Sequence, residues 1–93
     1  MRRGRRFVIP QAVVSVLPAS TDVSRIGLIT PKVVGNSVLR HKTARMIRAG
    51  AALFLAERSR SVDLVVRAQA GASKLSPSDW REILNAACER ASL

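Results

Sequence analysis

Apolar and polar positions follow patterns that are typical of β-strands in three stretches of the chain. These stretches are Phe7–Leu17, Arg25–Thr30 and Val62–Val66. In the first, β-branched residues dominate, and Val14 and Val16 alternate with Ser15, as in a strand with one buried face. The turn-forming cluster Pro18–Asp22 separates the first stretch from the second. We therefore expect the first two strands to pair in antiparallel orientation.

The next segment has apolar and basic residues that repeat with the 3.6-residue period of a helix. This pattern predicts a helix that begins after Gly35, where Asn36 or Ser37 can cap the free backbone N–H groups, and that runs to about Arg58. Three basic residues occupy positions i, i+4 and i+7 of this helix, and so form one stripe: His41, Arg45 and Arg48. Apolar residues fall on the opposite side: Leu39, Met46, Ile47, Gly50 and Phe54. One side of the helix can therefore pack on a sheet while the other presents positive charge.

A second helix is predicted after the loop Gln69–Lys74. Ser76 can cap it, Pro77 suits the first helical position, and Asp79 lies near its positive end. The helix reaches about Ala91. The elements follow the order β-β-α-β-α, with no internal repeat, and residues 1–93 are expected to form a single domain.

The charge of the chain indicates which kind of partner it binds. The chain has 16 Lys and Arg against 6 Asp and Glu, a net charge of +10 and a sequence pI near 11.8. This excess favours a polyanionic partner, with nucleic acid first and an anionic membrane surface second. The basic tail, residues 1–6, is expected to be mobile until an anion orders it. No apolar run approaches the ~18 residues that a membrane span requires.

The residues that could support catalysis do not form a recognisable site. His41 is the only histidine, and no carboxylate lies at helical spacing to orient it as a general base. The six acids are scattered, and Gly35 does not belong to a glycine-rich phosphate loop. Cys88 is the only cysteine, which excludes an internal disulfide and a thiol metal cluster. We therefore expect neither catalytic nor metal-binding residues.

A nucleic-acid interface is better supported. No acidic residue occurs between Asp22 and Glu57, whereas a helix face that only provides solubility usually carries both signs. The cations around this strand and helix are Arg25, Lys32, Arg40, Lys42, Arg45 and Arg48. Aromatic residues are few, and Phe7 is the one candidate for stacking on a base. The pattern predicts contact with a phosphate backbone and little sequence readout.

The same segment resembles the protein subunit of bacterial ribonuclease P. That family has a strand Arg-hydrophobic-Gly, then Lys-Lys-Val-Gly-Asn-Ala-Val and a basic helix Arg-Asn-Arg-x-x-Lys-Arg. The matching residues here are Arg25-Ile-Gly27, Lys32-Val-Val-Gly35-Asn36-Ser37-Val38 and Arg40-His41-Lys42, with Arg45 and Arg48. Downstream, Asp63-Leu-Val-Val66 and Ala68-Gln-Ala70-Gly71-Ala72 are similar to the family's Asp-hydrophobic strand and Arg-Pro-Gly-Ala loop.

Several positions depart from the family pattern. His41 stands where asparagine is usual, Lys42 where the second arginine is, Ala44 in place of a frequent lysine and Ala70 in place of a frequent proline. The family normally has an aromatic-bearing helix before its Arg-Gly-Arg stretch, and this sequence starts at about that stretch. The expected consequence is a groove for the 5′ leader that lacks one wall.

The resemblance implies an α+β fold, a small α/β sandwich whose crossover is left-handed, against the usual rule. It implies an accessory subunit of an endoribonuclease in which the RNA subunit, with bound magnesium, hydrolyses the phosphodiester. The implied partners are ribonuclease P RNA and precursor tRNA, in the cytoplasm, with no membrane and no required protein partner. The implied RNA-binding residues are Arg25, Lys32, Asn36, Arg40, His41, Lys42, Arg45 and Arg48.

Other functions stay open at this point. A ribosomal-type or other non-catalytic protein that binds structured RNA would show the same charge pattern. A membrane-surface or presequence-like protein would use the basic start and the apolar stretch behind it. A reader of duplex DNA is less favoured, because the cationic helix lacks helix-turn-helix spacing.

Overall fold

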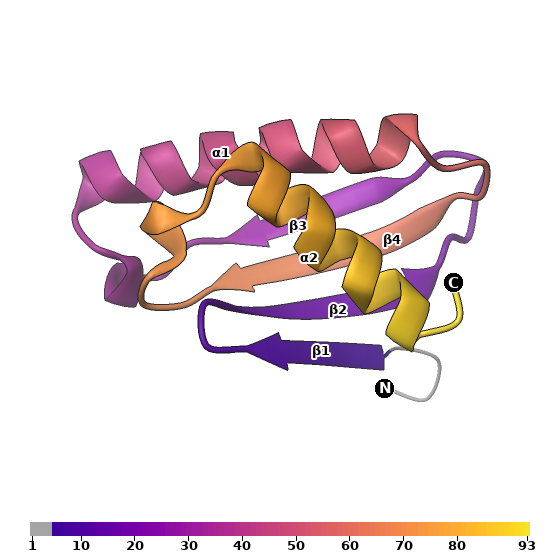
Figure 1. Cartoon of the computed structure of the whole chain (residues 1–93), viewed down its shortest axis with the longest axis horizontal. Helices are drawn as coiled ribbons and strands as arrows, with labels where there is room; N and C mark the ends of the chain where they lie inside the picture. The colour runs from indigo at the N-terminus through magenta and orange to yellow at the C-terminus, as the bar shows by residue number, and fades with distance from the viewer. Residues whose placement is uncertain (1–4) are drawn as a thin grey trace.

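The computed structural model describes residues 5–93, which form one four-stranded sheet covered on one face by two helices (Figure 1). The strands are β1 (Arg5–Ile9), β2 (Ala12–Pro18), β3 (Arg25–Ile29) and β4 (Val62–Ala68). Their order across the sheet is β1-β2-β4-β3, so the mixed sheet has β1 and β3 at its two edges. The predicted α+β class is confirmed.

The single strand predicted over Phe7–Leu17 is wrong, because the chain reverses within it. Pro10 and Gln11 form a tight turn, after which Ala12 pairs with Ile9 in an antiparallel hairpin. Proline has no backbone N–H to donate to a ladder, so a sheet accepts it at such a reversal and not inside a central strand.

This hairpin also changes the prediction for the basic tail. Arg5 and Arg6 are part of β1 and pair with Val16 and Ser15, so these two residues are not a mobile tail. The rest of the predicted tail, residues 1–4, lies outside the described residues.

The predicted antiparallel pairing of the first and second strands is also wrong for Arg25–Ile29. This strand, β3, runs parallel to β4, with Ile26 opposite Leu64. A helix connects the two strands and returns the chain to the starting end of β3, which is how parallel neighbours are joined. Viewed from the helices with β3 and β4 pointing up, β4 lies to the left of β3, so the crossover is left-handed (Figure 1).

Both helices begin at the predicted caps. The connecting helix is α1 (Ser37–Ala56), where the Asn36 side chain accepts a hydrogen bond from the backbone N–H of Leu39 at 3.0 Å. The second helix, α2 (Pro77–Arg90), has a reciprocal capping box between Ser76 and Asp79. Two short 3₁₀ turns, η1 (Lys32–Val34) and η2 (Ala72–Lys74), precede the helices.

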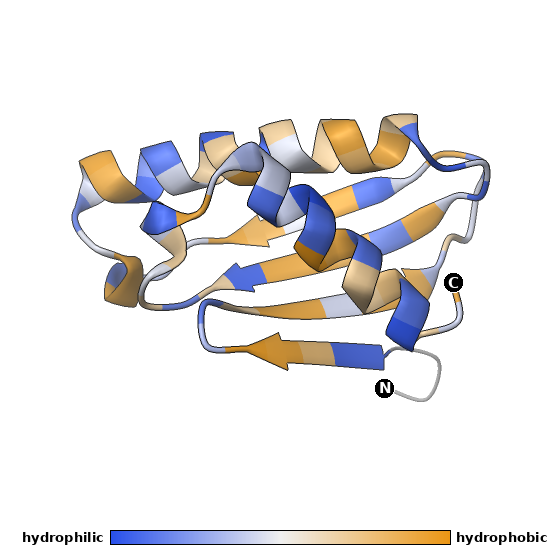
Figure 2. Cartoon of the chain, viewed as in Figure 1, coloured by the Kyte–Doolittle hydropathy of each residue, from blue (hydrophilic) through white to orange (hydrophobic). Residues whose placement is uncertain are grey.

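The hydrophobic core lies between the helices and one face of the sheet (Figure 2). Its largest fully buried side chains are Trp80, Phe54, Ile47, Leu64 and Leu84. Residues of β2 and β4 alternate strictly between this core and the other face, which we call the outer face of the sheet. Both described helices cover the core face. No helix in residues 5–93 is long and apolar enough to cross a membrane.

Candidate nucleic-acid interface

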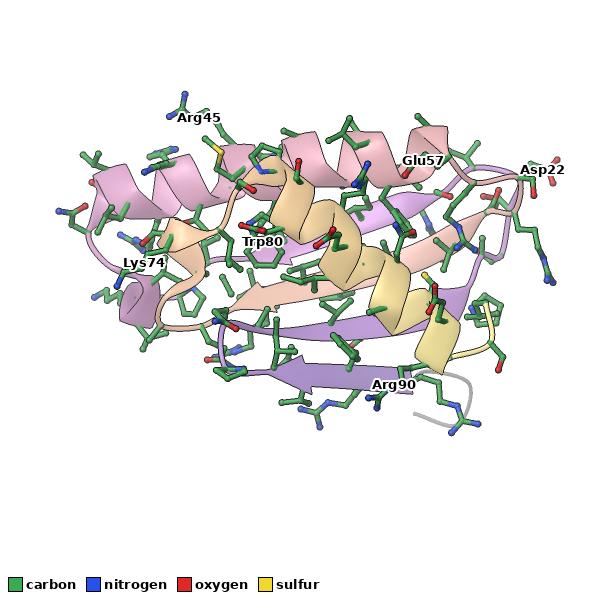
Figure 3. All side chains as sticks on the ribbon, in the orientation of Figure 1. Asp22, Arg45, Glu57, Lys74, Trp80 and Arg90 are labelled. Atoms are coloured by element: carbon green, nitrogen blue, oxygen red, sulfur yellow. The ribbon has the colours of Figure 1, made fainter. Side chains whose placement is uncertain are left out.

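The first half of α1 carries a cationic face, defined by His41, Lys42, Arg45 and Arg48. All four side chains are exposed, and Figure 3 shows Arg45 projecting from the helix away from the sheet. On the opposite side, Ile47, Gly50 and Phe54 are buried against the core, which confirms the predicted division of the helix.

The charge of this face is not neutralised by neighbouring acids. Two ion pairs occur among the described residues, Arg25–Asp63 at 2.9 Å and Arg81–Glu57 at 3.8 Å, and neither uses a cation of α1. The helix itself contains no acidic residue. Positive charges with no local partner attract an external polyanion, and here they are concentrated on one helix.

Arg40 lies at the edge of the cationic face and not on it. Its side chain is half-buried, and its Nε has no hydrogen-bond partner among the described residues. A hollow opens beside it, lined by Thr30, Ser37, Arg40, His41, Ala44 and Arg48. The fold therefore brings three of the predicted site residues together around one concave surface.

Arg25 is separated from these residues by the sheet. Its strand position places it on the outer face, where it binds Asp63 and donates a hydrogen bond to Ser20 Oγ at 3.1 Å. This pairing raises the pKa of Arg25, and the Arg25 guanidinium lowers the pKa of the Asp63 carboxyl. The expected grouping of Arg25 with the cations of the helix is therefore wrong.

The two predicted residues before α1 differ in role. Lys32 is exposed in η1, which precedes α1, and its contact with RNA stays a prediction. Asn36 is also exposed, but its Oδ1 is occupied by the cap on α1. Its contact with RNA stays a prediction.

The outer face of the sheet carries candidate residues that the sequence analysis missed. Besides Arg25, two more arginines on it belong to strands, Arg6 in β1 and Arg67 in β4, and both are exposed. Apolar side chains surround them, and three are notably exposed: Val8, Ile29 and Val65, at 65%, 43% and 38%. The sequence could have indicated two of these residues. Side chains alternate between the two faces of a strand, and this alternation along Val62–Ala68 places Val65 and Arg67 on the side opposite the core.

Phe7 is not available as a stacking platform on this outer face. Its side chain points to the core side of the sheet and packs against the core, and the Arg90 guanidinium lies 5.7 Å from the centre of its ring. Strand β1 therefore offers no aromatic side chain on the outer face for stacking on a base.

Metal-binding side chains are not grouped in this fold. Within residues 5–93, no three or more His, Cys, Asp and Glu side chains gather closely enough to hold a metal ion.

Comparison with known proteins matches this architecture to one family. The family model described as Ribonuclease P matches residues 1–92. The ribonuclease P protein component of Rhodococcus erythropolis is 33% identical and aligns with 99% of this chain and 76% of its own length. That of Pseudarthrobacter chlorophenolicus is 36% identical, over 96% of this chain and 63% of its own length. The chain thus spans 76% and 63% of the length of these two relatives.

Solved structures agree with the sequence match. The RNase P protein of Staphylococcus aureus superposes with a TM-score of 0.74 at 25% identity, covering 97% of this chain and 83% of that chain. The RNase P protein of Thermotoga maritima has a TM-score of 0.74 at 22% identity, covering 96% and 84%, and so supports the fold alone. Since the family match extends over nearly every residue, this chain belongs to the ribonuclease P family, as the protein component of that tRNA-processing endoribonuclease.

Proposed function

We propose that this protein binds the catalytic RNA of ribonuclease P through the cationic face of α1 and assists removal of the 5′ leader from precursor tRNA. The observation that carries the proposal is the concentration of exposed cations on one helix with no acidic partner. RNA presents a regular array of phosphates, and a row of cations on a rigid helix binds such an array largely independently of sequence.

The binding is electrostatic. Lys42, Arg45 and Arg48 contact backbone phosphates, Arg40 does so at the flank of the helix, and Lys32 extends the surface at its start. Each neutralised phosphate releases counterions, so affinity falls steeply with salt. About five such contacts lower affinity by about five hundredfold between 50 and 200 mM salt.

The leader of the precursor lies on the outer face of the sheet. This face combines apolar side chains with Arg6 and Arg67, which suits the bases and phosphates of a single strand. The outer face meets the hollow beside α1 at the end of the edge strand β3. Ile29 belongs to the outer face, and the next residue, Thr30, lines that hollow. One RNA molecule can therefore contact both surfaces around the edge strand β3.

The protein contributes binding and the RNA contributes chemistry. Magnesium held by the RNA subunit supplies the hydrolysis, and this chain places the substrate through its cations. We place this action in the cytoplasm, with precursor tRNA and ribonuclease P RNA as partners and neither a membrane nor another protein required.

The direct test is cleavage of precursor tRNA by a bacterial ribonuclease P RNA at low magnesium, with and without this protein. We expect the protein to stimulate cleavage, because its cations replace part of the screening that magnesium otherwise gives to the RNA. Salt-sensitive RNA binding without stimulation would support instead a structural RNA-binding role, such as that of a ribosomal-type protein. Absence of both would overturn the proposal for this chain.

A further inference from the structure

A second hollow, which we call the apolar hollow, lies beside the second half of α1. It has a volume of about 440 Å³ and opens between this helix and the edge strand β3. One of its lining residues is Arg48, and the others are apolar: Ile26, Leu28, Ala51, Ala52 and Leu55. The two strand residues and Leu55 are only partly buried against the core, so apolar surface stays open to solvent. Such surface favours an occupant that is itself apolar on its faces.

The backbone of β3 borders this hollow with hydrogen-bonding groups that the fold does not use. The strand pairs with β4 on one side and has no neighbouring strand on the other. Within the described part of the chain, the backbone of residues 26–29 makes no hydrogen bond beyond that pairing. An edge strand presents a row of free N–H and C=O groups. The site therefore combines apolar walls with donors and acceptors along one border.

The surface next to the hollow indicates which occupant it takes. Arg48 belongs to the cationic face and lines both hollows beside α1, so a chain bound to that face passes the mouth of the apolar hollow. No acidic residue lines the hollow. A second copy of this protein would bring another Arg48 and a net charge of +10 to the same edge, and like charges oppose that contact.

We propose that the apolar hollow receives one unstacked base of the ribonuclease P RNA. The faces of the base lie against the aliphatic side chains, its edge bonds to the free backbone groups of β3, and Arg48 holds the adjoining phosphate. Proteins bind splayed-out bases by such contacts, with flat faces on apolar or guanidinium surfaces and edges hydrogen-bonded. The inference rests on the proposed function and adds to it a base contact that does not depend on charge.

The experiment fills the hollow and measures affinity for ribonuclease P RNA. Ala52 is exposed, so Ala52→Trp occupies the hollow without disturbing a core contact. We expect affinity to fall about tenfold, in line with the loss of one stacked base. Ala56→Trp is the matched control, because Ala56 is exposed one turn later on α1 and does not line the hollow. It should bind as the wild type does, and circular dichroism checks the fold of both variants.

The salt dependence separates a base contact from a phosphate contact. The slope of log affinity against log salt should be the same for Ala52→Trp as for the wild type, because no phosphate contact is removed. Lys42→Gln should reduce that slope by about one. A reduced slope for Ala52→Trp would show that the hollow acts through charge, which would overturn the inference.

Chemical probing of the RNA identifies the base. Reagents that modify the Watson–Crick edges of unpaired bases should find one nucleotide that the wild-type protein protects and Ala52→Trp leaves reactive. Replacing that nucleotide with an abasic one should lower the affinity of the wild type about tenfold. The same replacement should leave the affinity of Ala52→Trp unchanged, because the two changes remove one contact.

A further measurement does not depend on the RNA. Adenosine carries no phosphate, so its binding reports the base contact alone. In an NMR titration of the wild type, adenosine should shift the methyl resonances of Ile26, Leu28 and Leu55, and Ala52→Trp should abolish these shifts.

The outcomes separate this inference from the proposed function. If Ala52→Trp and the wild type bind the RNA with equal affinity and protect the same nucleotides, the base site is overturned while RNA binding stands. If the protein binds no RNA but adenosine shifts the methyl resonances, the proposed function fails and the hollow remains a site for bases. If sedimentation without RNA shows a dimer that Ala52→Trp dissociates, the hollow is an interface between two copies and the inference is overturned.

Discussion

At the scale of single residues, Gly50 shows how close packing changes the meaning of a sequence position. In an isolated helix a glycine costs about 1 kcal/mol relative to alanine. Here α2 lies directly against it. A Cβ added at this position would lie 2.5 Å from Cβ of Trp80 and 2.6 Å from the backbone oxygen of Pro77. Both distances are too short for a real contact, so the absence of a side chain at Gly50 allows the two helices to meet.

We therefore predict that Gly50→Ala destabilises the protein, although helix propensity alone predicts stabilisation. Overpacking of this kind costs about 1–3 kcal/mol, since α2 must move away from α1. Urea unfolding followed by the fluorescence of the buried Trp80 measures the free energy of unfolding.

The control for this prediction is Ala52→Gly, at an exposed position of the same helix. It should lower the free energy of unfolding by about 1 kcal/mol through propensity alone. A stabilised Gly50→Ala protein would show that the interface between the helices can yield, which would contradict the packing argument.

At the scale of elements, α1 combines a structural and a binding role on opposite sides. We predict that Arg45→Glu together with Arg48→Glu abolishes binding to ribonuclease P RNA and leaves the fold intact. Both side chains are exposed, so their replacement disturbs no core contact, while each change replaces an attraction to phosphate with a repulsion. Gel shift measures binding and circular dichroism measures the fold.

The matched control is the pair Arg60→Glu and Arg90→Glu, which produces the same change in net charge. These exposed residues lie outside α1, in the segment before β4 and at the end of α2. Retained RNA binding in the control and loss in the α1 variant would separate the helix face from total charge. Equal loss in both would contradict the assignment to that face.

The capping box at the start of α2 makes the stability of the fold depend on pH. The backbone N–H of Ser76 donates to Asp79 Oδ2 at 2.8 Å, and this hydrogen bond holds the pKa of the Asp79 carboxyl below its ordinary value. A lowered pKa in the folded state means that the carboxylate stabilises the fold at pH values above the ordinary value, near 3.9. That stabilisation is lost as the pH falls through the lower value in the folded protein.

We predict that Asp79→Asn is less stable than the wild type at pH 6 and that the two proteins converge in stability toward pH 2. Asparagine resembles the protonated acid in shape. The difference in free energy of unfolding between the two proteins therefore measures how much the negative charge of Asp79 stabilises the fold. Urea unfolding at a series of pH values measures it. A difference that does not change with pH would show that the Asp79 charge does not contribute.

The helix boundaries could be predicted from the sequence because each cap uses residues close together in the chain. Asn36 and Ser76 bond to backbone groups three residues away, and the chain carries both partners in one short segment. Strand partners are different, because β3 pairs with residues 38 positions away, as in the contact of Arg25 with Asp63. Local pattern does not encode which distant segment a strand joins.

At the scale of the whole molecule, the helices cover one face of the sheet and leave the outer face to other contacts. We predict that Arg67→Gln weakens affinity for precursor tRNA carrying a 5′ leader and leaves affinity for tRNA without a leader unchanged. The reason is that Arg67 lies on the outer face, between Val13 and Ile29, where we place the leader. Binding of the two RNAs to the reconstituted ribonucleoprotein measures the difference.

The control is Arg60→Gln, which removes the same charge as Arg67→Gln. Arg60 is exposed and lies in the segment before β4, outside the outer face. It should affect both RNAs equally and slightly. If Arg67→Gln also lowered both affinities equally, the outer face would not discriminate the leader.

The sequence by itself determined the two helices with their caps, the division of α1 into a cationic and a buried side, and the resemblance to the ribonuclease P family. Each of these depends on residues that are neighbours in the chain or on one helix. Only the tertiary structure decided that β3 runs parallel to β4, that Arg25 lies on the opposite face of the sheet from α1, and that Arg6, Val65 and Arg67 share the outer face. These features arise from pairing between distant segments, which is selected by burial of the whole core and not by local preference.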